Sequence, residues 1–93
     1  MPSYTVLDTI KRIDGSKQVE VLVASYTAET LQAHLEKAGK QIANKEEAEI
    51  VLLFTTKKAQ KAVYSEAFSK ANPDAAKGYL GRWTKTGFET SGD

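Results

Sequence analysis

The sequence Thr55-Thr56-Lys57-Lys58 combines residue types that bind anions. It joins an apolar segment, which we interpret as a strand, to a segment with helical spacing, so both lysines fall in the first turn of the expected helix. Backbone N–H groups are free there, and with the threonine hydroxyls and the ammonium groups they favour a phosphate or the carboxylate of a partner. Lys61 lies one turn further along and belongs to the same candidate site. In the alternative interpretation the lysines simply point into water. The segment also lacks the glycine spacing of a phosphate-binding loop.

A second candidate surface lies further along the chain, where basic and aromatic side chains alternate within a short segment. Single-stranded nucleic acids bind to such surfaces, because the cations contact phosphates and the rings stack on bases. Tyrosine, tryptophan and arginine are also common anchors in protein interfaces. Alternatively the rings belong to the core, and the solvent exposure of Trp83 and Tyr79 decides between these interpretations. The members of this surface are Lys77, Tyr79, Arg82, Trp83 and Lys85, followed by Phe88.

Two isolated titratable residues give no support for catalysis. Asp8 falls among apolar strand residues, where a carboxylate could act as a general acid or base, but a solvated position at a sheet edge or bulge is the favoured interpretation. His34 has no acidic residue at a suitable helical spacing, so we expect a surface histidine and not a member of a catalytic triad. We therefore expect no catalytic residues, and a protein that is not an enzyme.

The composition of the chain excludes several classes of site. Its 93 residues, 41% hydrophobic and 27% charged, are typical of one folded domain. The absence of cysteine excludes disulfides and thiolate metal sites, and a single histidine excludes sites that need two imidazoles, so we expect no metal and no cofactor. The longest apolar run, residues 50–54, is far shorter than a membrane-spanning helix, and residues 1–4 do not look like a signal peptide, so a cytoplasmic protein is expected.

Charge is unevenly distributed along the chain. Residues 1–49 carry six basic and eight acidic side chains, whereas residues 50–93 carry seven basic and four acidic ones. The second half is therefore locally basic and could bind an anionic partner if its lysines share a face. The overall net charge of +1 is nevertheless low for a protein dedicated to duplex nucleic acid.

Two segments rich in β-branched residues, 4–13 and 17–24, flank Asp14-Gly15 and predict a β-hairpin. A two-residue turn at Asp14-Gly15 gives one apolar face, and this alternation favours it over a three-residue loop. The predicted cross-strand pairs are Val6 with Val23, Asp8 with Val21, and Ile10 with Val19.

The rest of the chain predicts two helices and two further strands. A helix over 28–43, with Thr27 as its cap, buries an apolar row at Leu31, Leu35, Ala38 and Ile42; Gly39 within it marks either close packing against a sheet or a fraying end. The apolar segment 49–56 is expected to be a central strand covered on both faces. A helix over 57–71 has an apolar row at 59, 63, 67 and 71 and ends at Pro73. A last strand over 79–84 places Tyr79, Gly81 and Trp83 on one face.

These elements give a β-β-α-β-α-β order and an α+β fold, with about four strands in the sheet and two helices packed on it. The helix between the second and third strands is long enough for a crossover, which allows these strands to run parallel and the sheet to be mixed. We expect a single domain over 1–85 and a disordered tail over 86–93.

Several strings of the sequence resemble a group of small uncharacterised domains found in bacteria and their phages. The resemblance covers most of the chain and implies an accessory protein of a phage or mobile element that acts by binding. It carries no known catalytic residues. The strings are Tyr4-Thr-Val-Leu-Asp8, Lys11-Arg12, Val19-Glu-Val-Leu-Val23, Ala28-Glu-Thr-Leu31, Trp83-Thr84 and Phe88.

The function expected from the sequence is a non-enzymatic binding module that engages a protein or another anionic partner. The two surfaces involved are the 55–58 corner with Lys61 and the basic, aromatic segment 77–85. A single-stranded nucleic-acid-binding protein is the first alternative, and a small phosphate-ester enzyme at Thr55-Thr56 is the second. An unprotected strand at the sheet edge makes a homodimer a further expectation.

Overall fold

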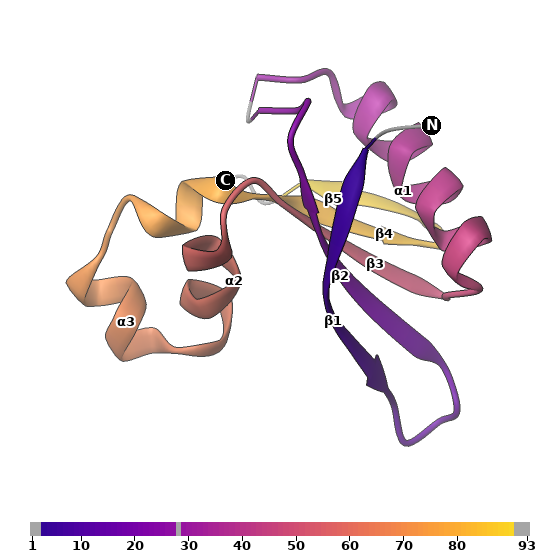
Figure 1. The fold of residues 1–93 in the computed structure, drawn as a ribbon, viewed down its shortest axis with the longest axis horizontal. Coiled ribbons are helices and arrows are strands. Elements are labelled where there is room, and N and C mark those ends of the chain that lie inside the picture. The colour runs from indigo at the N-terminus through magenta and orange to yellow at the C-terminus, as the bar shows by residue number, and fades with distance from the viewer. Residues whose placement is uncertain (1–2, 28, 91–93) are drawn as a thin grey trace.

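A five-stranded mixed sheet forms the centre of the structure, a computed structural model that describes residues 3–27 and 29–90 (Figure 1). The strand order is β1-β2-β3-β4-β5, with β2 and β3 parallel and all other neighbours antiparallel. The predicted α+β class, the mixed sheet and the central position of the third strand are thus confirmed. The elements are β1 (Tyr4–Lys11), β2 (Lys17–Val23), α1 (Gln32–Glu46), β3 (Ile50–Phe54), α2 (Lys57–Tyr64), α3 (Glu66–Ala71), the 3₁₀ helix η1 (Ala75–Gly78), β4 (Tyr79–Thr84) and β5 (Gly87–Thr90).

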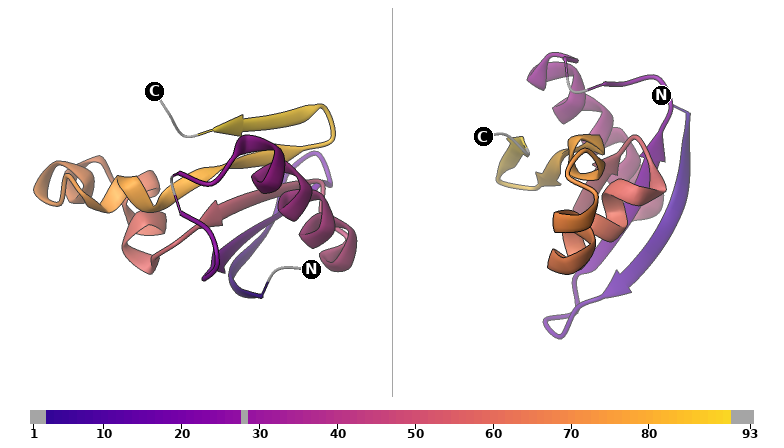
Figure 2. Two further views of the ribbon diagram at one scale, coloured as in Figure 1. Left: turned by 90° about the horizontal axis from the view of Figure 1, so that it is seen from above. Right: turned by 90° about the vertical axis from the view of Figure 1, so that its left-hand side faces the viewer.

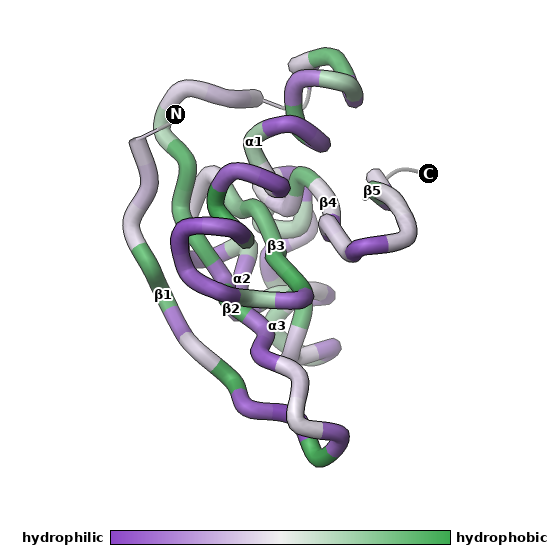
Figure 3. The backbone as a smooth tube through the Cα atoms, turned by 90° about the vertical axis from the view of Figure 1, so that its right-hand side faces the viewer, coloured by the Kyte–Doolittle hydropathy of each residue, from purple (hydrophilic) through white to green (hydrophobic). Residues whose placement is uncertain are grey.

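Helix α1 covers one face of the sheet and encloses the main apolar core with it. Alternate residues of β2 and β3 point toward α1, and Leu35 and Ile42 of the helix pack on them. Figure 3 shows the apolar course of β3 through the middle of the molecule. A Cβ at Gly39 would lie 2.6 Å from the Cβ of Trp83, so the helix approaches the sheet too closely for any larger residue there. Of the two interpretations of Gly39, close packing is the one that the structure bears out.

The opposite face of the sheet is covered only in part. Leu52 and Phe54 pack there against Ala59 of α2, and the ring of Tyr79 lies 5.2 Å from that of Phe54. The segment 57–78, formed by α2, α3 and η1, extends beyond one end of the sheet (Figure 2). We call this segment the helical arm. Its outer helix, α3, contains no buried residue.

The hairpin exists, but its predicted two-residue turn and register are wrong. Residues 12–16 form a longer loop, in which Arg12 N donates to Ser16 O at 2.8 Å and Gly15 N donates to Arg12 O at 3.0 Å. Asp14 Oδ1 accepts hydrogen bonds from the hydroxyl and the backbone N–H of Ser16, and these bonds lower the pKa of Asp14. An aspartate that bonds two residues ahead favours this wider turn. The pairing then shifts again between Val6 and Asp8, at a β-bulge, and the observed pairs are Val6 with Val21, Asp8 with Glu20, and Ile10 with Gln18.

Helix α1 begins at Gln32 and not at residue 28, which lies outside the described residues. Thr27 does not cap it; the Thr27 hydroxyl instead accepts from Glu29 N at 3.2 Å within a separate turn. Leu31, expected in the buried row, is therefore the residue before the helix and is 67% exposed. The three other predicted apolar positions of this helix are buried.

The helix predicted over 57–71 is two helices, because Ser65 interrupts it. The Ser65 backbone is extended, its N–H donates to Lys61 O at the end of α2, and its hydroxyl accepts from Phe68 N at 3.1 Å at the start of α3. Serine is favoured at such a cap because its side chain replaces the missing helical acceptor. The predicted apolar row is also wrong, since α2 buries Ala59 and Ala62 while Val63 is 42% exposed.

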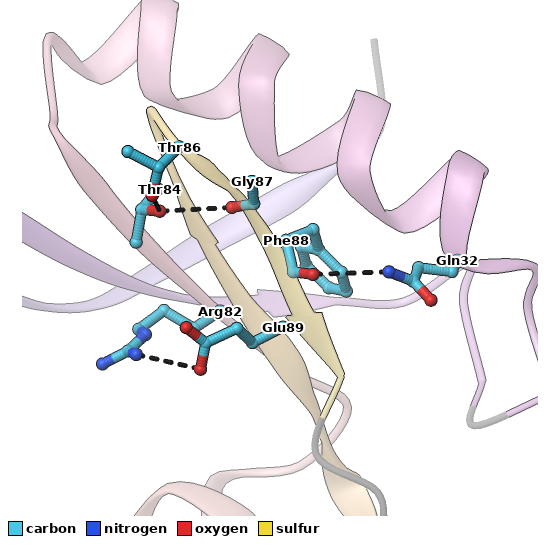
Figure 4. Close-up of polar contacts among 7 residues, drawn as sticks. All are labelled: Gln32, Arg82, Thr84, Thr86, Gly87, Phe88 and Glu89. Atoms are coloured by element: carbon cyan, nitrogen blue, oxygen red, sulfur yellow. Dashed lines mark hydrogen bonds and ion pairs between the residues drawn. The ribbon is translucent and has the colours of Figure 1, made fainter.

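The sheet has five strands and not four, because residues 87–90 of the expected disordered tail form β5. Phe88 pairs with Trp83 of β4 and packs in the main core, and Gln32 Nε2 of α1 donates to Phe88 O at 3.3 Å (Figure 4). This apolar anchor and the β4 partner compensate for the polar composition of the segment. Residues 91–93 of the expected tail lie outside the described residues.

The predicted faces of the last long strand need a correction. An irregularity in the β3–β4 pairing, next to Gly81 with φ +147°, places Leu80 beside Trp83 in the main core and turns Tyr79 to the opposite face. A Cβ at Gly81 would lie 2.5 Å from Glu89 O, so only glycine fits this approach of β5. Simple alternation therefore fails within β4.

None of the helices in residues 3–27 and 29–90 combines the length and the apolar character needed to cross a membrane.

Candidate functional site

The corner between β3 and α2 is held together by its own threonines. Thr55 N donates to Gly78 O at 2.7 Å, and the Thr55 hydroxyl donates to the same oxygen at 3.3 Å. The Thr56 hydroxyl caps α2 by accepting from Ala59 N at 3.1 Å. Both hydroxyls thus have partners within the fold, and only the Thr56 O–H remains available as a donor toward a ligand.

Gly78 brings the two candidate surfaces of the sequence into contact at this corner. A Cβ at Gly78 would lie 2.9 Å from the hydroxyl oxygens of both Thr55 and Thr56, so η1 lies directly against the start of α2. Lys77 and Tyr79, which flank Gly78, therefore lie near the 55–58 corner although they are some twenty residues away in sequence.

A hollow of about 400 Å³ lies between the start of α2 and the connection from α3 to η1. Its two charged lining residues are Lys58 and Asp74, and Asp74 is already paired with Lys77 at 2.9 Å. We call it the arm hollow. Its lining residues are Thr56, Lys58, Ala71, Asn72, Pro73, Asp74 and Ala75.

Three lysines at the start of the arm carry its uncompensated positive charge. Lys57 and Lys58 are exposed, and Lys61 lies with its ammonium 4.7 Å from the centre of the Phe68 ring. Among the residues that the structure describes, none of the three forms an ion pair. The other arm lysines do form ion pairs, with Glu66 and Asp74.

The basic, aromatic segment does not form one surface. Trp83 is 9% exposed and packs toward α1, whereas Tyr79 and Arg82 lie on the opposite face of the sheet. Arg82 is paired with Glu89 at 3.1 Å (Figure 4), and burial raises the pKa of Tyr79. Lys85 lies exposed in the turn between β4 and β5. Of this segment, the structure brings only Lys77 and Tyr79 to the 55–58 corner.

The most unusual polar residue of the structure, Glu20, was not singled out from the sequence. Its side chain is 0% exposed, on the face of β2 that α2 covers. The carboxylate accepts hydrogen bonds from Gln18 Nε2 at 3.0 Å, from Gln60 Nε2 at 2.5 Å, and from the hydroxyl of Tyr64. Within residues 3–27 and 29–90, no basic side chain lies within ion-pair distance of it. We call these four residues the Glu20 cluster.

The Glu20 cluster fastens the arm to the sheet. Gln60 and Tyr64 belong to α2, while Gln18 and Glu20 belong to β2. Burial and the hydrogen bond to Glu20 raise the pKa of Tyr64 to about 12, so its hydroxyl stays protonated and can donate. Arg12 Nη1 donates to Gln18 Oε1 at 3.1 Å and extends the network to the hairpin loop. In β2, Gln18 and Glu20 alternate with valines, a pattern that indicates a polar face of the strand. That face is buried because α2 lies over it.

Asp8 and His34 lie as expected. Asp8 is exposed beside the bulge of β1, and its Oδ1 accepts from Thr9 N at 2.8 Å. His34 is exposed on α1. In the part of the chain that the structure describes, no three histidine or carboxylate side chains are grouped so that they could hold a metal ion.

No protein-family model, curated protein or solved structure matches this chain.

Proposed function

We propose that this chain is a non-enzymatic binding module that docks its helical arm on an acidic segment of a protein partner. The observation that supports this proposal most directly is the group of Lys57, Lys58 and Lys61 on α2, which has no ion-pair partner among the described residues and of which Lys58 lines the arm hollow. Lysines in the first turn of a helix oppose the helix dipole, and an acidic partner would relieve that unfavourable arrangement.

The charge distribution favours one orientation of such a partner. The arm, residues 57–78, carries five lysines and two acidic residues, a net charge of +3, whereas the remaining residues carry a net charge of −2. An acidic segment is therefore attracted to the arm and repelled from the rest of the molecule. Such an asymmetry steers association and fixes orientation more than it adds affinity.

The arm hollow could bind a carboxylate of the partner. Lys58 supplies a charge there, and the Thr56 hydroxyl can donate while its oxygen accepts from Ala59 N. Asp74, the acidic residue of the lining, is compensated by Lys77. Beside the lysines, Val63 and Tyr64 are 42% and 59% exposed and would contribute apolar contacts typical of a protein interface.

A protein partner is favoured over a single-stranded nucleic acid by the position of the aromatic residues. Of the three rings expected to stack on bases, Trp83 and Phe88 are buried in the core, and Tyr79 is half-buried against Phe54. Base stacking on successive rings supplies much of the affinity of sequence-tolerant single-strand binding, whereas the arm exposes one ring, that of Tyr64. The homodimer through a sheet edge stays a prediction.

The proposal can be tested with a fluorescent peptide of mixed glutamate and leucine residues. We expect binding that weakens as salt is raised, and loss of binding in the triple variant Lys57→Glu, Lys58→Glu, Lys61→Glu. The matched control is Lys11→Glu, Lys40→Glu, Lys85→Glu, which changes the net charge equally at exposed positions outside the arm. Equal loss in both variants would show that only net charge matters.

Mixed-sequence single-stranded oligonucleotides serve as the competing ligand in the same assay. Tighter binding of the oligonucleotide than of the acidic peptide at every salt concentration, lost in the arm variant, would contradict the proposal and favour the nucleic-acid alternative. Thermal unfolding of each variant checks that all of them are folded.

A further inference from the structure

A second hollow, of about 500 Å³, lies on the flank of α1 away from the helical arm. On α1 it is lined by His34, Lys37, Ala38 and Gln41, which share one face of the helix because they are three, four and seven positions apart. Its other side is formed by Ser25 and Tyr26, from the connection after β2, and by Ser3. We call it the α1 hollow, and it shares no lining residue with the arm hollow.

The lining of the α1 hollow consists almost entirely of hydrogen-bond donors. Apart from Ala38, each of its residues carries an O–H or N–H group, and none is acidic. Within residues 3–27 and 29–90, none of these polar side chains forms a hydrogen bond or an ion pair with another protein group. Ser3, Ser25, His34 and Lys37 are exposed and Tyr26 and Gln41 are half-buried, so these groups are open to solvent and available to a ligand.

We infer that the α1 hollow binds a small polar phosphate monoester. Lys37 supplies the formal positive charge, and the serine and tyrosine hydroxyls, the His34 imidazole and the Gln41 amide supply further donors. A phosphate presents three terminal oxygens that accept several hydrogen bonds at once, which suits such a set better than a neutral ligand does. Because no lining carboxylate repels it, an anion enters without the cost of a like-charge contact.

The size and polarity of the hollow restrict the rest of the ligand. Its volume lies within the range of small-molecule sites and exceeds what inorganic phosphate needs. The apolar groups of the lining are Ala38 and the ring of Tyr26, so the organic part should be mostly polar, of the size and chemistry of a pentose or hexose. This inference does not depend on the proposed function, since neither the arm nor its lysines take part.

The test is a titration with ribose 5-phosphate, followed by backbone amide resonances. It uses protein that carries Lys57→Glu, Lys58→Glu and Lys61→Glu, so that the arm cannot capture the anion. We expect resonance changes confined to Ser3 and to residues 25–26 and 34–41, and none with ribose itself. Inorganic phosphate should bind at the same residues more weakly.

Two single substitutions on α1 complete the experiment. Lys37→Gln should weaken ribose 5-phosphate binding about tenfold, the amount expected for one charge-assisted contact. Lys40→Gln removes the same charge from an exposed position of the same helix that does not line the hollow, and it should leave the affinity unchanged.

The inference would be overturned by no binding at millimolar ligand, by changes scattered over the surface, or by equal weakening by both substitutions. Binding that is as strong for ribose as for its phosphate would overturn it as well, since the phosphate would then contribute nothing. Both substituted residues are exposed, so the variants should stay folded, and thermal unfolding checks this.

Discussion

Helix α1 and the helical arm both pack on the sheet, but they are attached by different chemistry. Helix α1 buries Leu35, Ala38 and Ile42, and its backbone comes close enough to Trp83 that position 39 must be glycine. The arm buries only Ala59, Ala62 and Gly78, and α3 buries nothing. Its attachment combines the packing of Ala59 on the sheet with hydrogen bonds, to Glu20 and between Thr55 and Gly78.

This difference predicts which region tolerates change. Apolar burial is stabilising roughly in proportion to area, so the α1 side should determine global stability. Buried polar contacts add little net stability when complete, but losing one partner leaves the others unsatisfied. The arm should therefore open locally, at a lower free energy than global unfolding, and remain adaptable for binding.

The largest expected effect is that of Trp83→Ala on the α1 side. Removing a buried indole from a close-packed core costs about 3–5 kcal/mol of the free energy of unfolding, which urea denaturation would measure. The matched change on the arm, Val63→Ala at a 42% exposed position, should stay within about 0.5 kcal/mol. Similar losses for the two variants would remove the distinction between the regions.

The next effect in size is that of Glu20→Ala, which removes the acceptor on which the arm is anchored. The donors of Gln18, Gln60 and Tyr64 then lose their shared partner, at a cost of about 1–3 kcal/mol. Amide hydrogen exchange should accelerate in α2 and α3 more than in α1. Glu89→Ala, which breaks an exposed ion pair with Arg82, is the control and should change stability by less than about 1 kcal/mol. Uniform acceleration across α1 and the arm would argue against a separately anchored arm.

A smaller and more local effect is expected for Ser65→Ala. The substitution removes the side-chain acceptor for Phe68 N and should destabilise α3 by about 1 kcal/mol. Amide protection of residues 66–71 should fall while that of β3 does not change. A continuous helix over 57–71, with protection retained, would contradict this prediction, because residues 66–71 would then be helical without the Ser65 cap.

The smallest effect concerns pH. The folded pKa of Tyr64 is raised to about 12 from 10.0, by burial first and then by the hydrogen bond to Glu20. A raised folded pKa means that the contribution to stability is complete below about pH 10 and is lost as pH approaches 12. Tyr4, bonded to Glu46, shows the same direction. Tyr64→Phe should therefore make stability fall less steeply over this range, as measured by urea denaturation at several pH values. An unchanged slope would mean that the phenol does not anchor the arm.

The parts of the fold predicted from the sequence are those fixed by local patterns. The apolar run 50–54 could only be a covered strand, and the row Leu35, Ala38 and Ile42 could only face a core. The errors lie where a side chain accepts a hydrogen bond from a backbone N–H group and so changes the local structure. Asp14 widens the hairpin loop in this way, and Ser65 divides a helix. The composition of residues 86–93 indicated disorder, but residues 87–90 form a strand because Phe88 pairs with Trp83 of the neighbouring strand.

The candidate site was predicted only in part, for a related reason. The lysines of the 55–58 corner stand out because they break a local rule about helix starts. The burial of Glu20 and of Trp83 depends on which helix covers which face, and no periodicity within β2 or β4 contains that information. The polar lining of the α1 hollow likewise comes from three separate segments.

The hydrogen bond from Gln32 to the carbonyl of Phe88 has a consequence for self-association. It occupies a backbone acceptor of β5, so a foreign strand that paired with Phe88 O would have to displace the Gln32 side chain. At the other boundary, the bulge between Val6 and Asp8 breaks the regular repeat that such a strand would need. Neither edge strand, β1 or β5, therefore presents an uninterrupted row of backbone groups on which a further strand could add, although β1 is hardly covered by other elements.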